Sequence, residues 1–317
     1  MDKSIKQNFS KIGLAFLAYI FIWQILSVFV VIIGDIFLLD LIPKSMVRYM
    51  SLSYGVLYFV AFPLFLLIMR FVPNCELHPS MNKKLYFHQI LPLFLIGMAV
   101  TIIIALAFNV FFMLFSDEPY NPIGDMIGEL DLVPTLIFTC VIAPIMEEIV
   151  FRKVLYKKIS AYGSSVYMIS SALFFSLFHL NLSQSAYAFF LGLILAWIMY
   201  RTGKVIYPIL FHFAANLLGG SLGLILMTVF DETVAMMISG MVNILLLLSG
   251  IVFAIILIIN IVNKKYTFSH AGNLAKPAWS TVFANPGYII FICITGIFIL
   301  FSFAIDILSR IDFMNFF

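Results

Sequence analysis

The chain has 317 residues, of which 63% are hydrophobic and only 10% are charged. Soluble domains carry about 25% charged residues, so this composition excludes an ordinary water-soluble protein and is typical of an integral membrane protein. The net charge of +3 gives no indication of a nucleic-acid partner. The three cysteines, Cys75, Cys140 and Cys293, are odd in number and far apart, which predicts neither a disulfide framework nor a metal knuckle.

Apolar runs of spanning length, about 20 residues, recur along the whole chain, and none alternates with the period of two that barrel strands require. The sequence therefore predicts an all-α, polytopic helix bundle that forms a single integral membrane domain over residues 1–317. Lys3, Lys6 and Lys11 precede the first run, which is too long for the apolar region of a signal peptide, so we expect an uncleaved helix. The nine predicted transmembrane helices are 12–33, 51–71, 88–115, 133–156, 165–182, 185–200, 205–229, 233–262 and 287–308.

The basic residues are distributed unevenly between the segments that connect these helices. If the N-terminus is cytosolic, 15 of the 18 lysines and arginines fall on the inner side and the acidic loop 116–132 falls outside. Positive charge accumulates on the cytosolic side of membrane proteins. We therefore predict a multi-pass protein of the cell membrane with a cytosolic N-terminus, an outer C-terminus and a cytosolic, interfacial loop over residues 263–286.

The fourth predicted helix contains three ionisable residues within the stretch "EEIVFR", which begins at Glu147. Glu148 and Arg152 are four residues apart with the glutamate first, the favourable order for an ion pair on a helix. Pairing offsets much of the several kcal/mol that a lone charge costs inside a bilayer. Glu147 lies about 100° further round the helix, so Arg152 cannot serve both carboxylates equally well. We therefore expect Glu147 to face a different partner.

Two other predicted helices carry a histidine that shares a helix face with a residue four positions away. The fifth places Phe175 four residues before His179, and the seventh places His212 four residues before Asn216. A single buried polar residue in a membrane helix often serves only to hold helices together. Four such groups on three helices indicate a functional site instead, because ionisable residues inside a membrane are costly.

A carboxylate, two imidazoles and an amide can hydrolyse an amide bond without a covalent intermediate. The carboxylate and an imidazole can deprotonate a water, while an imidazole N–H and an amide N–H can hold the oxyanion of the tetrahedral intermediate. A zinc site would use Glu147, His179 and His212. The stretch "HFAAN" offers an asparagine where a zinc-protease motif has its second histidine, so we favour a site that needs no cofactor.

These residues fall into three motifs that resemble a known family. "EEIVFR" matches E-E-x-x-x-R, "FSLFH" matches F-x-x-x-H and "HFAAN" matches H-x-x-x-N. In this order they resemble the CAAX-protease and bacteriocin-processing family (CPBP, or Abi), which includes the Ras-converting prenyl endopeptidases. The resemblance covers residues 133–220.

The resemblance implies an intramembrane endopeptidase, with a catalytic cavity formed by helices four, five and seven and open to the cytosol. Glu147 would activate water with help from His179, and His212 with Asn216 would form the oxyanion site. Glu148 and Arg152 would hold the architecture, and Phe175 would support the site. Bacterial members are linked to bacteriocin immunity and peptide maturation, so the expected partners are the lipid bilayer and a membrane-associated, prenylated or otherwise lipidated peptide.

Two other functions compete with this interpretation. A CPBP-like protein can act as a non-catalytic membrane regulator or bacteriocin-immunity partner that binds a sensor or receptor, although a scaffold has no need for Glu147 beside an already paired Glu148. A transporter could use intramembrane glutamate and histidine as a proton relay, but the broken helices and internal repeats typical of transporters are not evident in the sequence.

Overall fold

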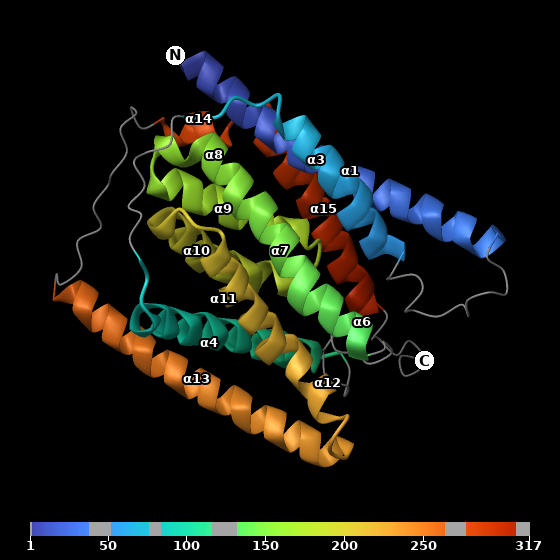
Figure 1. Cartoon of the computed structure of the whole chain (residues 1–317), viewed down its shortest axis with the longest axis vertical. Helices are drawn as coiled ribbons and strands as arrows, with labels where there is room; N and C mark the ends of the chain where they lie inside the picture. Colours follow the sequence, from blue (N-terminus) through green and yellow to red (C-terminus); the bar gives the residue numbers. More distant parts are fainter. Residues whose placement is uncertain (1, 38–51, 76–83, 116–131, 264–276, 309–317) are drawn as a thin grey trace.

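The computed structural model describes residues 2–37, 52–75, 84–115, 132–263 and 277–308 (Figure 1). Within these ranges all regular structure is helical, which confirms the prediction of an all-α polytopic bundle. The helices are α1 (Asp2–Phe37), the helix Leu52–Met69 that ends in α3 (Phe62–Met69), α4 (Phe87–Phe112), α6 (Leu132–Leu136), α7 (Ala143–Glu147), α8 (Leu155–Ile159), α9 (Ser164–Phe178), α10 (Leu182–Thr202), α11 (Ile206–Asn216), α12 (Leu222–Leu226), α13 (Glu232–Val262), α14 (Trp279–Phe283) and α15 (Pro286–Leu308).

Eight of the described helices are long and apolar enough to cross a membrane, where the sequence predicted nine. The exception is α9, whose 15 residues span about 22 Å at 1.5 Å per residue, against a hydrocarbon thickness of about 30 Å. It ends at Phe178, four residues before the predicted end at 182, because the chain turns there into α10. Of the predicted loop 263–286, residues 264–276 lie outside the described residues, and α14 occupies part of the remainder.

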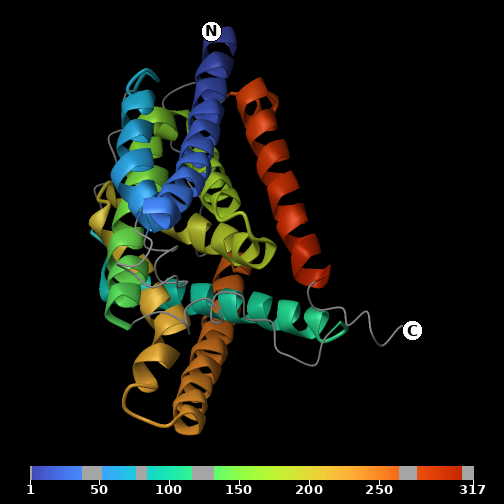
Figure 2. The same cartoon turned by 90° about the vertical axis from the view of Figure 1, so that its right-hand side faces the viewer.

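Glycines allow two pairs of helices to approach closely. A Cβ on Gly287 of α15 would meet the backbone of Ser10 on α1, and the Gly287 N–H donates to Ser10 Oγ at 3.0 Å. A Cβ on Gly250 of α13 would meet the carbonyl oxygen of Leu95 on α4, which crosses α13 (Figure 2). Small residues at helix contacts allow dispersion contacts between backbones, which stabilise association inside a membrane.

An aromatic core packs five helices of the bundle together. Phe16 of α1 stacks on Phe174 of α9 with ring centroids 4.2 Å apart, and it also contacts Phe65, Phe151 and Phe291. All five rings are buried. The core therefore joins α1, α3, the fourth spanning helix, α9 and α15 in a densely packed layer.

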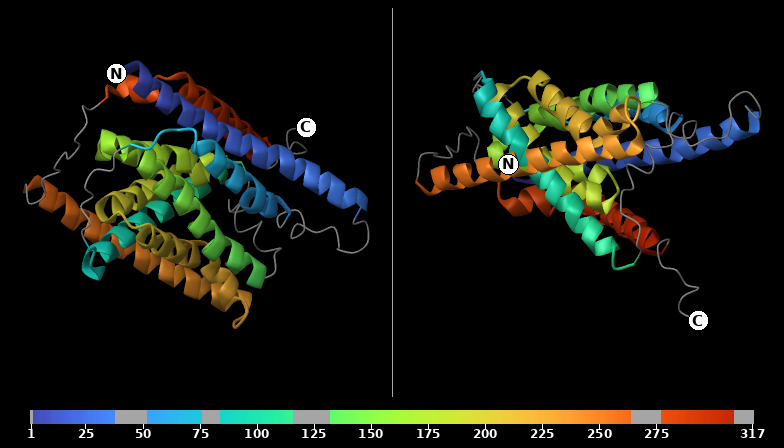
Figure 3. Two further views of the ribbon diagram at one scale, coloured as in Figure 1. Left: turned by 45° about the horizontal axis from the view of Figure 1, so that its top comes forward. Right: turned by 90° about the horizontal axis from the view of Figure 1, so that it is seen from below.

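The two ends of the bundle differ in charge. Figures 1 and 3 show the start of α1, α8 and α14 at one end, and α6 and α12 at the other. We name the first of these the basic end, because every described lysine and arginine except the buried Arg152 belongs to the helix ends and connections that meet there. These residues are Lys3, Lys6, Lys11, Arg70, Lys84, Lys153, Lys157, Lys158, Arg201 and Lys204.

The fourth spanning helix, Leu132–Tyr162, is interrupted by two π-helical segments, Ile137–Ile142 and Glu148–Val154. Pro144 lies in the first turn of α7 between them and lacks an N–H, so the carbonyl that it would have bonded inside the helix needs another partner. A π-helical segment shifts the register of the helix and leaves backbone groups outside the regular ladder, and such segments occur frequently at functional sites.

Candidate active site

Glu147 and Glu148 stand at the junction between α7 and the second π-helical segment, and they have different environments. Glu148 Oε2 lies 3.0 Å from Arg152 Nε, and both side chains are completely buried. Glu147 is 19% exposed, and its carboxylate borders a cavity. The two adjacent carboxylates therefore divide into one that holds a buried cation and one that can meet a ligand.

The guanidinium of Arg152 has a second contact within the bundle. Its Cζ lies 4.2 Å from the centre of the Phe175 ring on α9, within the range of a cation–π interaction. Glu148 and Phe175 thus hold Arg152 from two sides. Because removing one partner of a buried ion pair leaves an uncompensated charge, this arrangement fixes the packing of the fourth spanning helix against α9.

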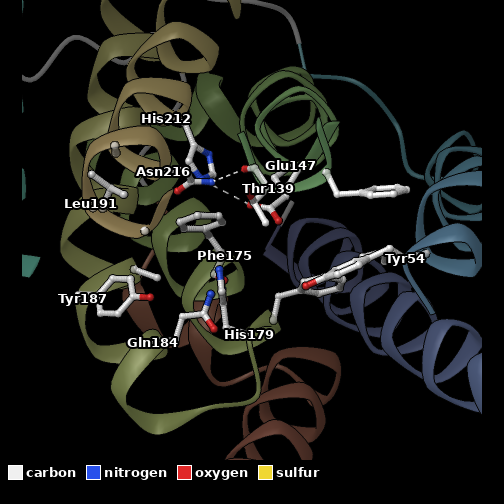
Figure 4. A pocket seen from close by; sticks show the side chains of 18 of the residues that line it. Tyr54, Thr139, Glu147, Phe175, His179, Gln184, Tyr187, Leu191, His212 and Asn216 are labelled. Atoms are coloured by element: carbon white, nitrogen blue, oxygen red, sulfur yellow. Dashed lines mark hydrogen bonds and ion pairs between the residues drawn. The ribbon is translucent and has the colours of Figure 1, made fainter. Parts of the chain in front are cut away.

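His212 of α11 bridges the two glutamates. Its Nδ1 lies 2.9 Å from Glu148 Oε1, and its Nε2 lies 3.8 Å from Glu147 Oε2 (Figure 4). A carboxylate only accepts hydrogen bonds, so Nδ1 carries the hydrogen that it donates to Glu148, and Nε2 points toward the cavity.

His179 is held at the turn between α9 and α10. Its Nδ1 donates to the carbonyl oxygen of Phe175 at 2.7 Å, which leaves Nε2 as the nitrogen that can accept a proton. Leu180, the next residue, has φ of 54°, a left-handed conformation that costs a residue with a Cβ about 1–2 kcal/mol. Ser185 Oγ donates to the Ser176 carbonyl at 2.8 Å across the same turn, and Asn181 caps α10. The hydrogen bonds across the turn maintain the strained backbone of Leu180 and so fix the position of the neighbouring His179 side chain.

Asn216 ends α11 and donates from Nδ2 to the carbonyl oxygen of Thr139 at 2.8 Å. Thr139 lies in the first π-helical segment. The sequence predicted only that Asn216 shares a helix face with His212. In the structure the Asn216 amide is also hydrogen-bonded to the fourth spanning helix. An amide nitrogen carries two hydrogens, so the second can still donate into the cavity.

All four predicted catalytic side chains, Glu147, His179, His212 and Asn216, line one cavity of about 890 Å³. Phe175 lies between the two imidazoles and contacts both rings edge to face, with centroids 4.9 Å from His179 and 5.6 Å from His212 (Figure 4). Glu148 and Arg152 do not line the cavity. Helices four, five and seven contribute to its wall as predicted, but so do α1, the helix Leu52–Met69, α4 and α10.

Several of the lining residues were absent from the predicted site. Tyr54 and Tyr58 line the cavity from the second spanning helix (Figure 4). Trp23 Nε1 donates to Ser53 Oγ at 3.2 Å, and Ser53 Oγ donates to Ser27 Oγ at 3.1 Å. Like the two histidines, these residues place polar groups, here hydroxyls and an indole N–H, inside apolar runs of the sequence. They belong to none of the three motifs, so the sequence analysis did not select them.

The three metal ligands suggested by the sequence, Glu147, His179 and His212, line one cavity. Within the described ranges, no group of three His, Cys, Asp or Glu side chains is arranged to hold a metal ion. The Nδ1 atoms of both imidazoles are bonded to protein oxygens, which leaves the Nε2 atoms as the nitrogens that can meet a ligand. Glu147, His179 and His212 line the same cavity without forming such a group of three.

The fold and this cavity define a polytopic membrane protein with a carboxylate, two imidazoles and an amide at a buried polar site. Residues 129–218 match the family model described as type II CAAX prenyl endopeptidase Rce1-like. The match confirms the resemblance to the CPBP/CAAX protease family over the segment that carries the three motifs. Comparisons with curated proteins and with solved structures found no match.

Proposed function

We propose that the protein is an intramembrane endopeptidase that hydrolyses a membrane-associated peptide or lipopeptide with water activated by Glu147. The observation that carries this proposal is the separation of roles between adjacent glutamates. The Glu148 carboxylate contacts Arg152 and His212. The Glu147 carboxylate borders the cavity, and its Oε2 lies 3.8 Å from His212 Nε2. At the level of the family, the match to a protease model supports hydrolysis.

In the proposed reaction, a water lies between the Glu147 carboxylate and the scissile carbonyl carbon. Glu147 takes a proton from this water, and the resulting hydroxide adds to the carbonyl to form a tetrahedral intermediate. His179 Nε2 accepts a hydrogen bond from the water and orients it. The C–N bond then breaks, Glu147 returns its proton to the leaving nitrogen, and the products are a carboxylate and an amine.

The negative charge that develops on the carbonyl oxygen needs hydrogen-bond donors. Asn216 Nδ2 is held by Thr139 and can supply its second N–H. His212 points its Nε2 toward the cavity, and this nitrogen is a second donor when it carries a hydrogen. Preorganised donors of this kind act strongly in a site with little water.

The substrate is expected to enter with an extended backbone and an apolar portion. Around the polar groups, the cavity wall is apolar along Val28, Val31, Met98 and Leu191. This wall suits the side chains of a membrane-inserted peptide or a covalently attached lipid, and the bilayer is the partner that would present it.

Incubating the purified protein with a library of membrane-associated peptides, with and without a chelator, tests the proposal. We expect cleavage that survives the chelator and is lost in Glu147→Ala and His212→Ala. Cleavage abolished by the chelator would contradict the metal-free mechanism. If the variants retain a cellular phenotype of the wild type and no peptide is cut, the protein acts as a non-catalytic membrane regulator.

A further inference from the structure

The cavity occupies one half of the bundle, and this half is the one away from the basic end. On α1 the lining residues run from Trp23 to Ile32, near the end of a spanning segment that starts at Lys3. On the second spanning helix they begin at Ser53, the second residue of Leu52–Met69. On α4 they reach Asn109, close to the end at Phe112.

The remaining spanning helices agree with this placement. The fourth contributes residues from Phe138 to Glu147, its first half. The helix Ile206–Leu226 contributes residues from His212 to Ser221, and the exposed Gly220 lies near its end at Leu226. Among the described residues, the lining of the cavity therefore extends toward the bundle end that contains α6 and α12.

Among the described residues, aromatic side chains pack the bundle between the cavity and the basic end. The aromatic core around Phe16 and Phe151 lies between the cavity and the lysines, and both rings are at most 1% exposed. A second cluster, formed by Tyr156, Tyr167 and Tyr200, adds further ring contacts in the same layer. Protein interiors of this kind pack with few voids, so a peptide has no path through them without rearrangement.

The charges indicate which side of the membrane each end faces. The described lysines and arginines, apart from Arg152, gather at the basic end, whereas Asp231 and Glu232 start α13 at the other. Cytosolic segments carry the excess of lysine and arginine. A cytosolic N-terminus and a cytosolic cavity, both predicted from the sequence, therefore do not fit together, because they lie at opposite ends of the bundle.

We propose that the cavity opens to the extracytoplasmic side and takes its substrate from there. The substrate class is then a peptide or lipopeptide segment that lies outside the membrane or in its outer leaflet, rather than a cytosolic chain end. The position of the opening stands on the geometry and the charges. The substrate class rests in addition on the proposed peptidase function.

Single-cysteine labelling tests the opening without any need for activity. Ser53→Cys and Gly220→Cys each place a thiol on the cavity wall near the mouth, in a background in which Cys75, Cys140 and Cys293 are serine. A Cβ at position 220 meets no atom within 4 Å, so the Gly220 variant keeps the packing. A membrane-impermeant maleimide is applied to intact cells and to permeabilised cells.

The chain supplies its own matched control for the opposite face. Cys75 lies at the basic end, where its N–H donates to the Lys157 carbonyl at 2.9 Å, and it is partly exposed. A variant that keeps Cys75 and replaces the other two cysteines reports on that side. We expect the thiols at 53 and 220 to be labelled to the same extent in intact and permeabilised cells, and Cys75 to be labelled only after permeabilisation.

The reverse pattern, with Cys75 labelled in intact cells and the thiols at 53 and 220 protected until permeabilisation, would overturn the proposal. Labelling at both mouth positions also guards against local misfolding of one variant, because they lie on different helices. Outward labelling combined with a failed peptidase assay would support the outward opening and reject the proposed enzymatic function, so the two failures are distinguishable.

Discussion

Replacing Glu148 with glutamine tests the buried charge cluster that underlies the site. The substitution preserves shape but removes the only carboxylate within 4 Å of the Arg152 guanidinium among the described residues, and both side chains are completely buried. Breaking a buried ion pair from one side costs about 3–5 kcal/mol, because the remaining charge stays in a medium that solvates it poorly. We therefore expect Glu148→Gln to lower the free energy of unfolding by about this amount.

The assay is thermal unfolding of the purified protein in detergent, with Glu147→Gln as the matched control. Glu147 has one ionic contact, at 3.8 Å, and is partly exposed to the cavity, so its neutral isostere removes little stabilisation. The double variant Glu148→Gln/Arg152→Met removes both charges and should recover part of the loss. Equal unfolding temperatures for the two single glutamine variants would refute the division of roles between the adjacent glutamates.

Three further variants test the packing of α15 against α1, the oxyanion site and the histidine that orients the water. Gly287→Ala should destabilise the protein by about 1–3 kcal/mol, because its Cβ meets the Ser10 backbone; Gly296→Ala on the same helix has open space and should leave the melting temperature unchanged. Asn216→Ala should lower kcat by about 10²–10³ with little change in KM, the loss expected for one oxyanion donor; an unchanged kcat would remove Asn216 from the oxyanion site. His179→Ala should lower kcat by about 10² while the fold persists, because the attacking water loses the hydrogen bond that orients it; wild-type turnover would show that His179 is dispensable.

Part of the site could be predicted because it depends on local helix geometry. The pairing of Glu148 with Arg152 follows from four-residue spacing, and the same spacing places His179 close to Phe175. The three motif-bearing helices could be recognised because a polar group inside an apolar run is costly and therefore conspicuous.

Other features depend on contacts that spacing along one helix does not encode. The bond between His212 and Glu148 joins residues 64 positions apart. The π-helical segments around Thr139 and Glu148 have no side-chain periodicity that distinguishes them from an α-helix in the sequence. The short α9 looked long enough to span the membrane because the apolar run continues through the turn at Leu180.

The end of the bundle nearer to which the cavity lies could not be predicted from the sequence either. Motif residues indicate which helices meet, but the depth of each lining residue is known only when several helices are aligned. The early positions of Ser53 and Phe138 in their helices, set against the late positions of Ile32 and Asn109, place the cavity away from the lysines.

In the proposed reaction the Glu147 carboxylate activates the attacking water. This role is tested by kcat/KM for a cleaved peptide in Glu147→Gln, a variant expected to keep the wild-type melting temperature. We predict a loss of about 10²–10⁴, the usual contribution of a positioned general base. A Glu147→Gln protein that cleaves the same bond at the wild-type rate would contradict the account.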